Sequence, residues 1–152
     1  NVFFFHVGYS INKGKNVIQI SEFKKWKKEG LINYYKHKDN IINLIKNSDC
    51  IVLPTYREGL PRSVIEGFAI GRPAIISKVI GTDNLIQENI NGFYCKPKDP
   101  ISLSKKIIKF YNLSFNKKVY LSNNCRKSSL YFNEKKVIDR YWSVIKRINK
   151  ND

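Results

Sequence analysis

Methionine is absent from the 152 residues, and the chain opens at Asn1 directly on an apolar segment. We therefore interpret the sequence as a fragment of a longer protein. No run of eighteen or more apolar residues occurs, which excludes a membrane-spanning helix within these residues. The apolar start also lacks the basic flank and the small-residue cleavage site of a signal peptide, so we expect a cytoplasmic protein.

Cysteine and acidic residues are both scarce. The three cysteines, Cys50, Cys95 and Cys125, have no C-x-x-C or Cys/His metal spacing, so we expect buried free thiols in a reducing cytosol and no metal site. Only 12 Asp and Glu stand against 28 Lys and Arg, and the net charge of +16 would attract phosphates, anionic lipid or nucleic acid. Most basic residues are lysines scattered through predicted helices, which is typical of solvated helix faces.

Short apolar runs alternate with helical stretches up to Asp99. The alternation predicts an α/β fold, a Rossmann-like parallel sheet with helices on both faces. We expect a single domain over 1–152, with its core at about 1–99 and C-terminal helices at about 100–150. The expected strands are 2–7, 31–35, 50–54, 73–77 and 92–95. The expected helices are 17–29, 39–47, 61–70, 83–88, 101–111, 117–129 and 133–148.

Local signals refine this scheme. The run CIVLP, residues 50–54, is apolar on both faces, as a buried central strand must be. Asp99 before Pro100 predicts a helix N-cap followed by a proline at the first helical position, and Gly71 is placed to end the preceding helix. His6 lies in an apolar strand, and we interpret it as a core or strand-end histidine rather than a catalyst.

The segment PTYREGLPRSVIEG, residues 54–67, predicts a ligand site where the buried strand ends and the next helix begins. Pro61 suits the first helical position because it has no N–H to leave unpaired. Free backbone N–H groups can converge on an anion there, helped by the positive end of the helix dipole. These are the N–H groups of Gly59, Leu60, Arg62 and Ser63.

Two acids flank this helix start. Glu58 precedes the helix and Glu66 lies inside it, so we expect their carboxylates roughly 10 Å apart with the anion between them. The spacing suits a sugar nucleotide, which has hydroxyls at both ends and a diphosphate in the middle. One alternative stays open, in which Glu58 is an acid favoured by the helix dipole and Glu66 is a solvated helix residue. Glycoside hydrolysis fits less well, because its two carboxyl groups must be aimed at one bond, about 5 to 10 Å apart.

The stretch SDCIVLPTYREGLPRSVIEGFAIGRPAIISKVIGTDNLIQENINGFYCKPKDPISLSKKI resembles the C-terminal, donor-binding domain of the retaining group 1 (family 4) glycosyltransferases of GT-B fold. Within it, the segment YREGLPRSVIEG is particularly similar in sequence to family members that build bacterial capsule, lipopolysaccharide or lipid-linked oligosaccharide. The resemblance implies that Glu58 is the catalytic residue that binds hydroxyls of the transferred sugar. It also implies that the backbone from Gly59 to Pro61 adjoins the sugar and diphosphate, and that Glu66 binds the ribose.

The same resemblance implies a nucleotide-sugar donor, with a UDP-sugar favoured, and no cofactor or essential metal. Its partners would be a glycan or lipid-linked acceptor, a missing N-terminal domain against which the helices to Ile148 pack, and an anionic membrane touched at its periphery. The sequence departs from the family where an Arg would hold the diphosphate, since Tyr9 stands there. We expect the first strand and the phosphate-binding Arg and Lys to be lost with the N-terminus, and keep Lys13 as a candidate phosphate ligand.

Two other classes compete with this interpretation. One is a basic module that binds nucleic acid or a membrane surface without catalysis, motivated by the charge and by aromatics near lysines. No RNP-like, helix-turn-helix or Lys/Arg-block signature accompanies that charge, so we expect no nucleic-acid partner. The other is a related GT-B epimerase or phosphorylase-like enzyme, which lacks this frame of acids.

Overall fold

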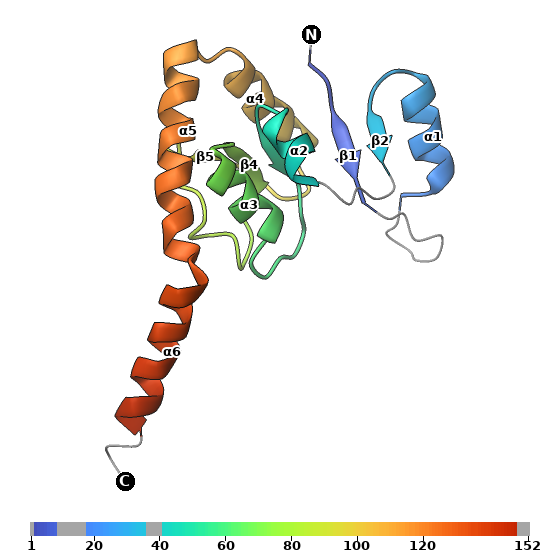
Figure 1. The fold of residues 1–152 in the computed structure, drawn as a ribbon. Helices are drawn as coiled ribbons and strands as arrows, with labels where there is room; N and C mark the ends of the chain where they lie inside the picture. Colours follow the sequence, from blue (N-terminus) through green and yellow to red (C-terminus); the bar gives the residue numbers. More distant parts are fainter. Residues whose placement is uncertain (1, 9–17, 36–40, 149–152) are drawn as a thin grey trace. The chain divides into compact units, whose positions relative to one another are not determined.

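The computed structural model describes residues 2–8, 18–35 and 41–148, which fall into two compact units divided after Ile41 (Figure 1). The first unit contains strand β1 (Phe5–Val7), helix α1 (Ile20–Lys28) and strand β2 (Asn33–Tyr35). The two strands pair in parallel. Phe23 of α1 is buried, and its ring stacks on Tyr34 at a centroid distance of 4.8 Å. A parallel strand, helix, strand unit is therefore present, as the alternation predicts.

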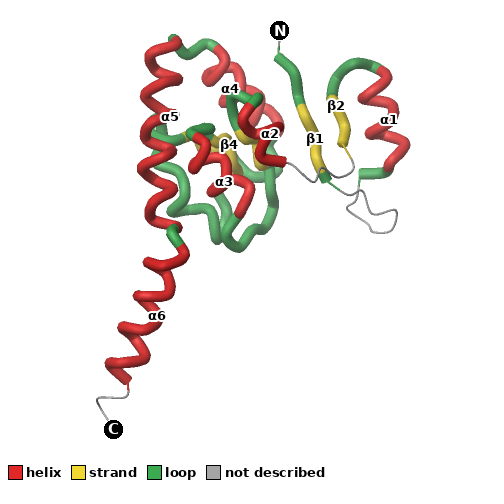
Figure 2. Tube along the Cα trace, in the orientation of Figure 1, coloured by secondary structure: helices red, strands yellow, loops and turns green. Residues whose placement is uncertain are grey.

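The second unit is built on a three-stranded parallel sheet in the order β3-β4-β5. Figure 2 labels its middle strand, β4, among the helices. The strands are β3 (Ile51–Leu53), β4 (Ala74–Ser77) and β5 (Gly92–Cys95). Helix α2 (Ile41–Lys46) precedes β3, and α3 (Arg62–Ile70) connects β3 to β4. After β5 come α4 (Pro100–Tyr111), α5 (Phe115–Ser129), the 3-10 turn η1 (Leu130–Phe132) and α6 (Glu134–Ile148). The predicted helical C-terminal segment is confirmed.

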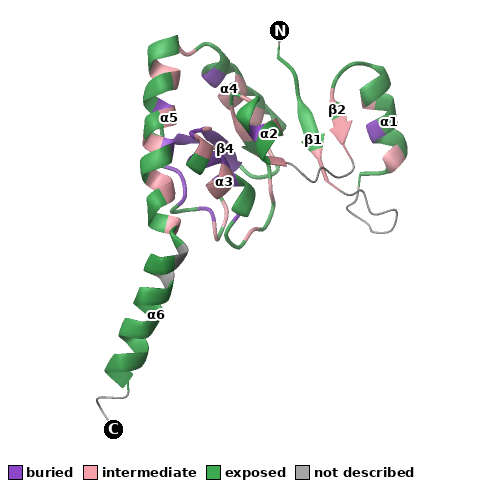
Figure 3. Ribbon diagram, viewed as in Figure 1, coloured by how far each residue is buried: buried purple, intermediate pink, exposed green. Residues whose placement is uncertain are grey.

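The sheet of the second unit is covered on both faces, and Figure 3 shows its buried middle strand, β4, among the helices. Successive residues of a strand point to opposite faces, so β4 contributes to two cores. Ala74 and Ile76 join one core, and Ile75 joins the other. The first core also holds Val64 and Phe68 of α3 and Cys125 of α5. The second holds Phe93 of β5, Phe110 of α4 and Leu121 of α5. The predicted Rossmann-like arrangement is confirmed.

The predicted helix caps are confirmed at two places. Asp99 is the N-cap of α4, where its Oδ1 accepts a hydrogen bond from the N–H of Ser102 at 2.8 Å, and Pro100 follows at the helix start. Gly71 ends α3 with φ at +86°, a left-handed conformation that glycine adopts without strain.

Three predictions about elements are wrong. The run CIVLP is not fully buried: Ile51 and Leu53 are half-buried and Val52 is 36% exposed, and among the described residues of its unit β3 pairs with β4 alone. The helix expected over 83–88 is absent: residues 83–85 form a turn, the next two are irregular, and Glu88 forms an isolated bridge with Gly92. Pro61 is the N-cap of α3 rather than its first helical residue, since its ψ of 102° is extended. Strand ends also differ, and only the strand at 92–95 matches at both ends.

Helix α6 carries an apolar stripe. Tyr141, Val144, Ile145 and Ile148 are all exposed, as is every other described side chain of this helix. Among the described residues, no helix combines the length and the apolar character needed to cross a bilayer.

Candidate functional site

The loop between β3 and α3 carries the predicted site residues. It leaves the carboxyl end of β3 and runs to Pro61 (Figure 1). Thr55 gives the loop a local turn, because its hydroxyl donates to the carbonyl of Arg57 at 2.9 Å and accepts from the N–H of Arg57 at 3.4 Å. The loop therefore lies at the edge of the sheet where parallel α/β folds bind ligands.

The N-terminus of α3 is open. Its N-cap, Pro61, offers no side-chain hydrogen bond to the helix, and its carbonyl takes the N–H groups of Val64 and Ile65 at 3.1 and 3.3 Å. Four exposed residues at this helix start have backbone N–H groups that donate to no described residue. They are Gly59, Leu60, Arg62 and Ser63. The structure thus leaves donors at the positive end of a helix dipole available to an anion.

The two acids of the segment lie on either side of this helix start along the chain. Glu58 is in the loop and Glu66 is in the second turn of α3, and both are half-buried. Neither carboxylate forms a hydrogen bond or an ion pair with any residue that the structure describes. Glu88 shows the contrast, because it accepts from the N–H of Tyr94 at 2.8 Å and pairs with Lys106 at 2.5 Å. Unlike Glu88, the carboxylates of Glu58 and Glu66 therefore stabilise no contact within the described fold.

Other predicted ligands contribute less. Lys13, the candidate phosphate ligand, lies outside the described residues, as does Tyr9. Within the described ranges, no group of three or more His, Cys, Asp or Glu is arranged to hold a metal ion. The two basic residues nearest in sequence, Arg57 and Arg62, are both exposed at the loop and the helix start. Their charges add to the positive potential of the free N–H groups.

The remaining titratable groups with shifted pKa values are structural. His6 is exposed on β1, so it is not a core residue, but its ring lies against Phe23, 4.6 Å between centroids, and this partial burial lowers its pKa. The ring contact supports a packing role on the strand. The cysteines are free thiols, with Cys95 and Cys125 buried and Cys50 half-buried. Burial raises the pKa of Cys50 strongly and that of Cys125 to about 12, so both remain protonated at neutral pH.

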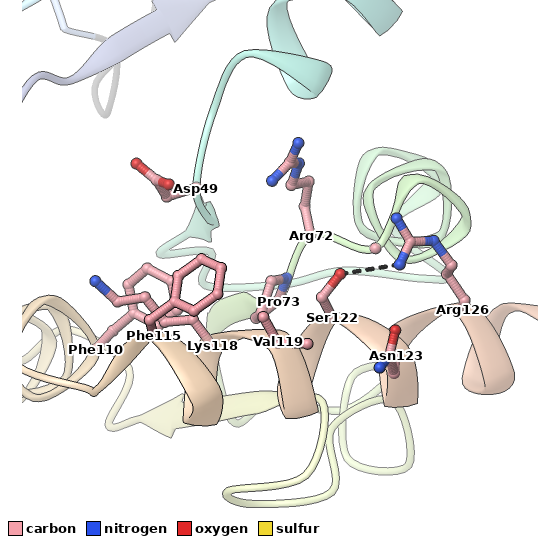
Figure 4. A pocket seen from close by; sticks show the side chains of 11 residues that line it. Asp49, Arg72, Pro73, Phe110, Phe115, Lys118, Val119, Ser122, Asn123 and Arg126 are labelled. Carbon is pink, nitrogen blue, oxygen red and sulfur yellow. Dashed lines mark hydrogen bonds between the residues drawn. The ribbon is translucent and has the colours of Figure 1, made fainter.

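A pocket of about 330 Å³ lies at the opposite end of the sheet, beside Asp49 before β3 and Pro73 before β4 (Figure 4). Three cations line it, and each donates to the carbonyl of the last residue of a helix. Arg72 Nη2 bonds Lys46 at 2.6 Å, Arg126 Nη2 bonds Ile70 at 3.1 Å, and Lys118 Nζ bonds Tyr111 at 3.1 Å. These side chains neutralise the carboxyl ends of α2, α3 and α4, so the pocket belongs to the architecture rather than to a ligand.

The open helix start at the carboxyl edge of a parallel sheet places the chain among α/β domains with the architecture of nucleotide-binding folds. A family model described as glycosyl transferases group 1 matches residues 7–128, which include the loop and all of α3. The chain belongs to the group 1 glycosyl transferases.

Curated relatives agree with this family. A Campylobacter jejuni protein, N,N'-diacetylbacillosaminyl-diphospho-undecaprenol alpha-1,3-N-acetylgalactosaminyltransferase, is 31% identical over 125 residues, or 80% of this chain and 32% of that protein. An Escherichia coli protein, UDP-Gal:alpha-D-GlcNAc-diphosphoundecaprenol alpha-1,3-galactosyltransferase, is 28% identical over 118 residues, or 74% of this chain and 26% of that protein. The chain therefore spans a third or less of the length of these two relatives.

Solved structures share the fold. The Anabaena protein Alr3699/HepE in complex with UDP matches with a TM-score of 0.83 and 18% identity, over 96% of this chain and 41% of that chain. Sucrose-phosphate synthase from Thermosynechococcus elongatus matches with a TM-score of 0.79 and 18% identity, over 97% of this chain and 39% of that chain. The expected fold, the Rossmann-like C-terminal half of a GT-B glycosyltransferase, is confirmed.

Proposed function

We propose that the protein transfers a hexosyl group from a nucleotide-diphosphate sugar to a glycan or lipid-linked acceptor, with retention at the anomeric carbon. In this proposal the chain supplies the donor-binding half of the enzyme. One observation carries it: four backbone N–H groups without partners among the described residues surround the start of α3, with unpartnered carboxylates before and after them. Anion donors beside hydroxyl acceptors match the chemistry of a sugar nucleotide.

The proposed roles follow from the charge that develops during transfer. The bond from the anomeric carbon to the diphosphate breaks, and its electron pair leaves with the diphosphate. The hydroxyl oxygen of the acceptor forms the new bond to the anomeric carbon, and its proton passes to the departing diphosphate. The N–H groups of Gly59 and Leu60, with those that open α3, would stabilise that charge without reorganising. Glu58 would accept hydrogen bonds from hydroxyls of the transferred sugar, and Glu66 from the ribose. The proposal assigns no step to a metal or cofactor.

The names of the relatives favour a UDP-sugar and a lipid-linked acceptor. The E. coli relative is named for UDP-Gal, and the Anabaena structure holds UDP. Both named transferases act, by their names, on sugars linked to undecaprenol through a diphosphate. We extend these properties to this chain as part of the proposal. They agree with the free backbone donors at the helix start.

We also propose that α6 contacts the N-terminal domain that the resemblance implies, through its stripe of Tyr141, Ile145 and Ile148. These side chains are exposed and recur at helical spacing on one face.

The excess of lysines would give the enzyme a peripheral contact with anionic lipid, worth about 1 kcal/mol for each basic residue at the surface. Sedimentation with anionic vesicles, compared with neutral ones, tests that contact.

The donor assignment can be tested by thermal shift of the full-length protein with UDP-, GDP- and ADP-sugars. The best donor is then measured with Glu66→Gln, which keeps the size of the side chain and removes its charge. Asp139→Asn is the matched control, because Asp139 is an exposed acid on α6. We expect Glu66→Gln to weaken donor binding by about tenfold or more, the effect of one hydrogen bond to a charged group, and Asp139→Asn to leave it unchanged.

Two results would count against the proposal. If no nucleotide sugar stabilises the wild-type protein, the donor assignment is wrong. If binding occurs but Glu66→Gln retains the wild-type affinity, the ribose role is wrong. The salt dependence of binding distinguishes the competing class, a basic surface module that binds nucleic acid. Such a module loses affinity steeply between about 50 and 200 mM salt, whereas a site that holds a nucleotide sugar through a few donors does not.

A further inference from the structure

The turn between β4 and β5 lies against the loop that carries the predicted diphosphate donors. A side chain built on Gly81 would collide with the carbonyl oxygens of Glu58 and Gly59. Both carbonyls therefore face Gly81 at a distance that leaves no room for a methyl group. Gly81 also has φ at +91°, in the left-handed region where any other residue is strained. Two independent constraints thus require glycine at this position.

The contact sets the direction of two N–H groups. The described residues contain no cis peptide bond, and in a planar trans peptide the C=O and the N–H point in opposite directions. The carbonyl of Glu58 shares its peptide with the N–H of Gly59, and the carbonyl of Gly59 shares its peptide with the N–H of Leu60. Because both carbonyls face Gly81, both N–H groups are turned away from it, to the same side.

The turn itself is held rigidly. Thr82 is fully buried, and its hydroxyl lies 2.8 Å from the carbonyl of Ser77 and 2.9 Å from that of Val79, while it accepts from the N–H of Val79 at 3.0 Å. The hydroxyl of Tyr94 on β5 donates to the carbonyl of Thr82 at 2.5 Å. Thr82, the residue after Gly81, is therefore bonded both to the end of β4 and to β5, and it fixes the turn next to Gly81.

We infer that Gly81 is a positioning residue of the donor site, which aims the N–H groups of Gly59 and Leu60 at the diphosphate through its contact with the loop. Thr82 acts with it by fixing the turn. This inference rests on the proposed function, because the ligand of those N–H groups is the donor diphosphate. Gly81 itself touches no ligand, and its effect passes through the loop backbone.

The test compares Gly81→Ala with Gly30→Ala in the full-length protein. Gly30 also has a positive φ, +71°, but a Cβ there meets nothing within 4 Å, so its variant carries the backbone strain without the collision. Affinities for UDP and for uridine are measured by ligand-observed NMR. We expect Gly81→Ala to lower the affinity for UDP by about tenfold or more, since hydrogen bonds to phosphate are lost, and to change that for uridine less than threefold. Gly30→Ala should change neither.

Each outcome decides between the two claims. If the wild-type protein binds no UDP, GDP or ADP, the proposed function fails. If it binds UDP and a folded Gly81→Ala binds UDP equally well, or loses UDP and uridine in equal proportion, the positioning role is refuted. Should Gly81→Ala not fold, Thr82→Val replaces it, because it removes the hydroxyl at nearly constant shape. Thr82→Ser restores the hydroxyl and should recover UDP affinity, and recovery that does not occur would equally refute the inference.

Discussion

Replacing Gly67 by alanine should destabilise the second unit, although alanine is the better helix former. Gly67 is buried in α3 against β3, and a Cβ built there lies 2.7 Å from Cγ1 of Ile51 and 3.4 Å from its Cδ1. Cγ1 is bonded to a branched Cβ on a strand, so rotation cannot carry it far from the helix. Overpacking of this kind costs about 1 to 3 kcal/mol, whereas the gain in helix propensity is about 1 kcal/mol.

We therefore expect Gly67→Ala to lower the free energy of unfolding by about 1 kcal/mol, and to raise it by up to about 1 kcal/mol when Ile51→Ala has removed Cγ1 and Cδ1. This reversal of sign is the test, since a double-mutant cycle isolates the contact. Urea unfolding is followed by circular dichroism at 222 nm, because Trp26 and Trp142 lie outside this contact. Ala69→Gly, at an exposed position of the same helix, measures the propensity alone. A Gly67→Ala that stabilises the wild-type background would refute the reasoning.

Three further results are expected. The pKa of His6 should lie below 6.5; it is measured by NMR from the imidazole signal that disappears in His6→Gln. The neutral imidazole therefore contributes to stability above pH 6.5, and this contribution is lost as the pH falls through the pKa of the folded protein. Asp99→Ala should lower the stability of the second unit by about 1 kcal/mol in urea titration, and Asp99→Asn by much less, because asparagine also caps. Cys125 should resist thiol reagents until the protein unfolds, and its burial should make stability fall between pH 9.0 and about 12. Rapid labelling of native Cys125 would contradict its burial.

The alternation of apolar runs predicted every described strand, but their ends are decided by partners that the pattern does not contain. Leu31 looks like the start of a strand, yet its N–H donates to the carbonyl of Trp26 at 2.9 Å and closes α1. Gly30, with its positive φ, makes that turn. The strand begins only at Asn33, where pairing with Phe5 starts. A backbone group used by a helix end is not available to a sheet, whatever its side chain.

The helix expected over 83–88 failed for a related reason. The N–H of Ile86 donates to the hydroxyl of Tyr94 at 3.1 Å, and that of Gln87 donates to the side chain of Asn91 at 2.8 Å. These acceptors lie later in the chain and replace the carbonyls that a helix would supply. Helix propensity could not reveal the bond to Tyr94, because Tyr94 reaches Ile86 only once β5 is in place beside β4.

In the candidate site, one property follows from local sequence and another depends on residues distant in the chain. Which N–H groups are free follows from local sequence, because Pro61 has no side chain that can cap the helix and no N–H of its own. The direction of those N–H groups does not follow from local sequence. It depends on the carbonyls of the loop that contact Gly81, which comes after α3 and β4 in the chain. In our proposal, a loop with the same residues but a larger residue in the turn would keep its free N–H groups and lose their alignment. The acids around Pro61 identify the loop from the sequence, whereas the proposed direction of its N–H groups depends on the glycine after β4.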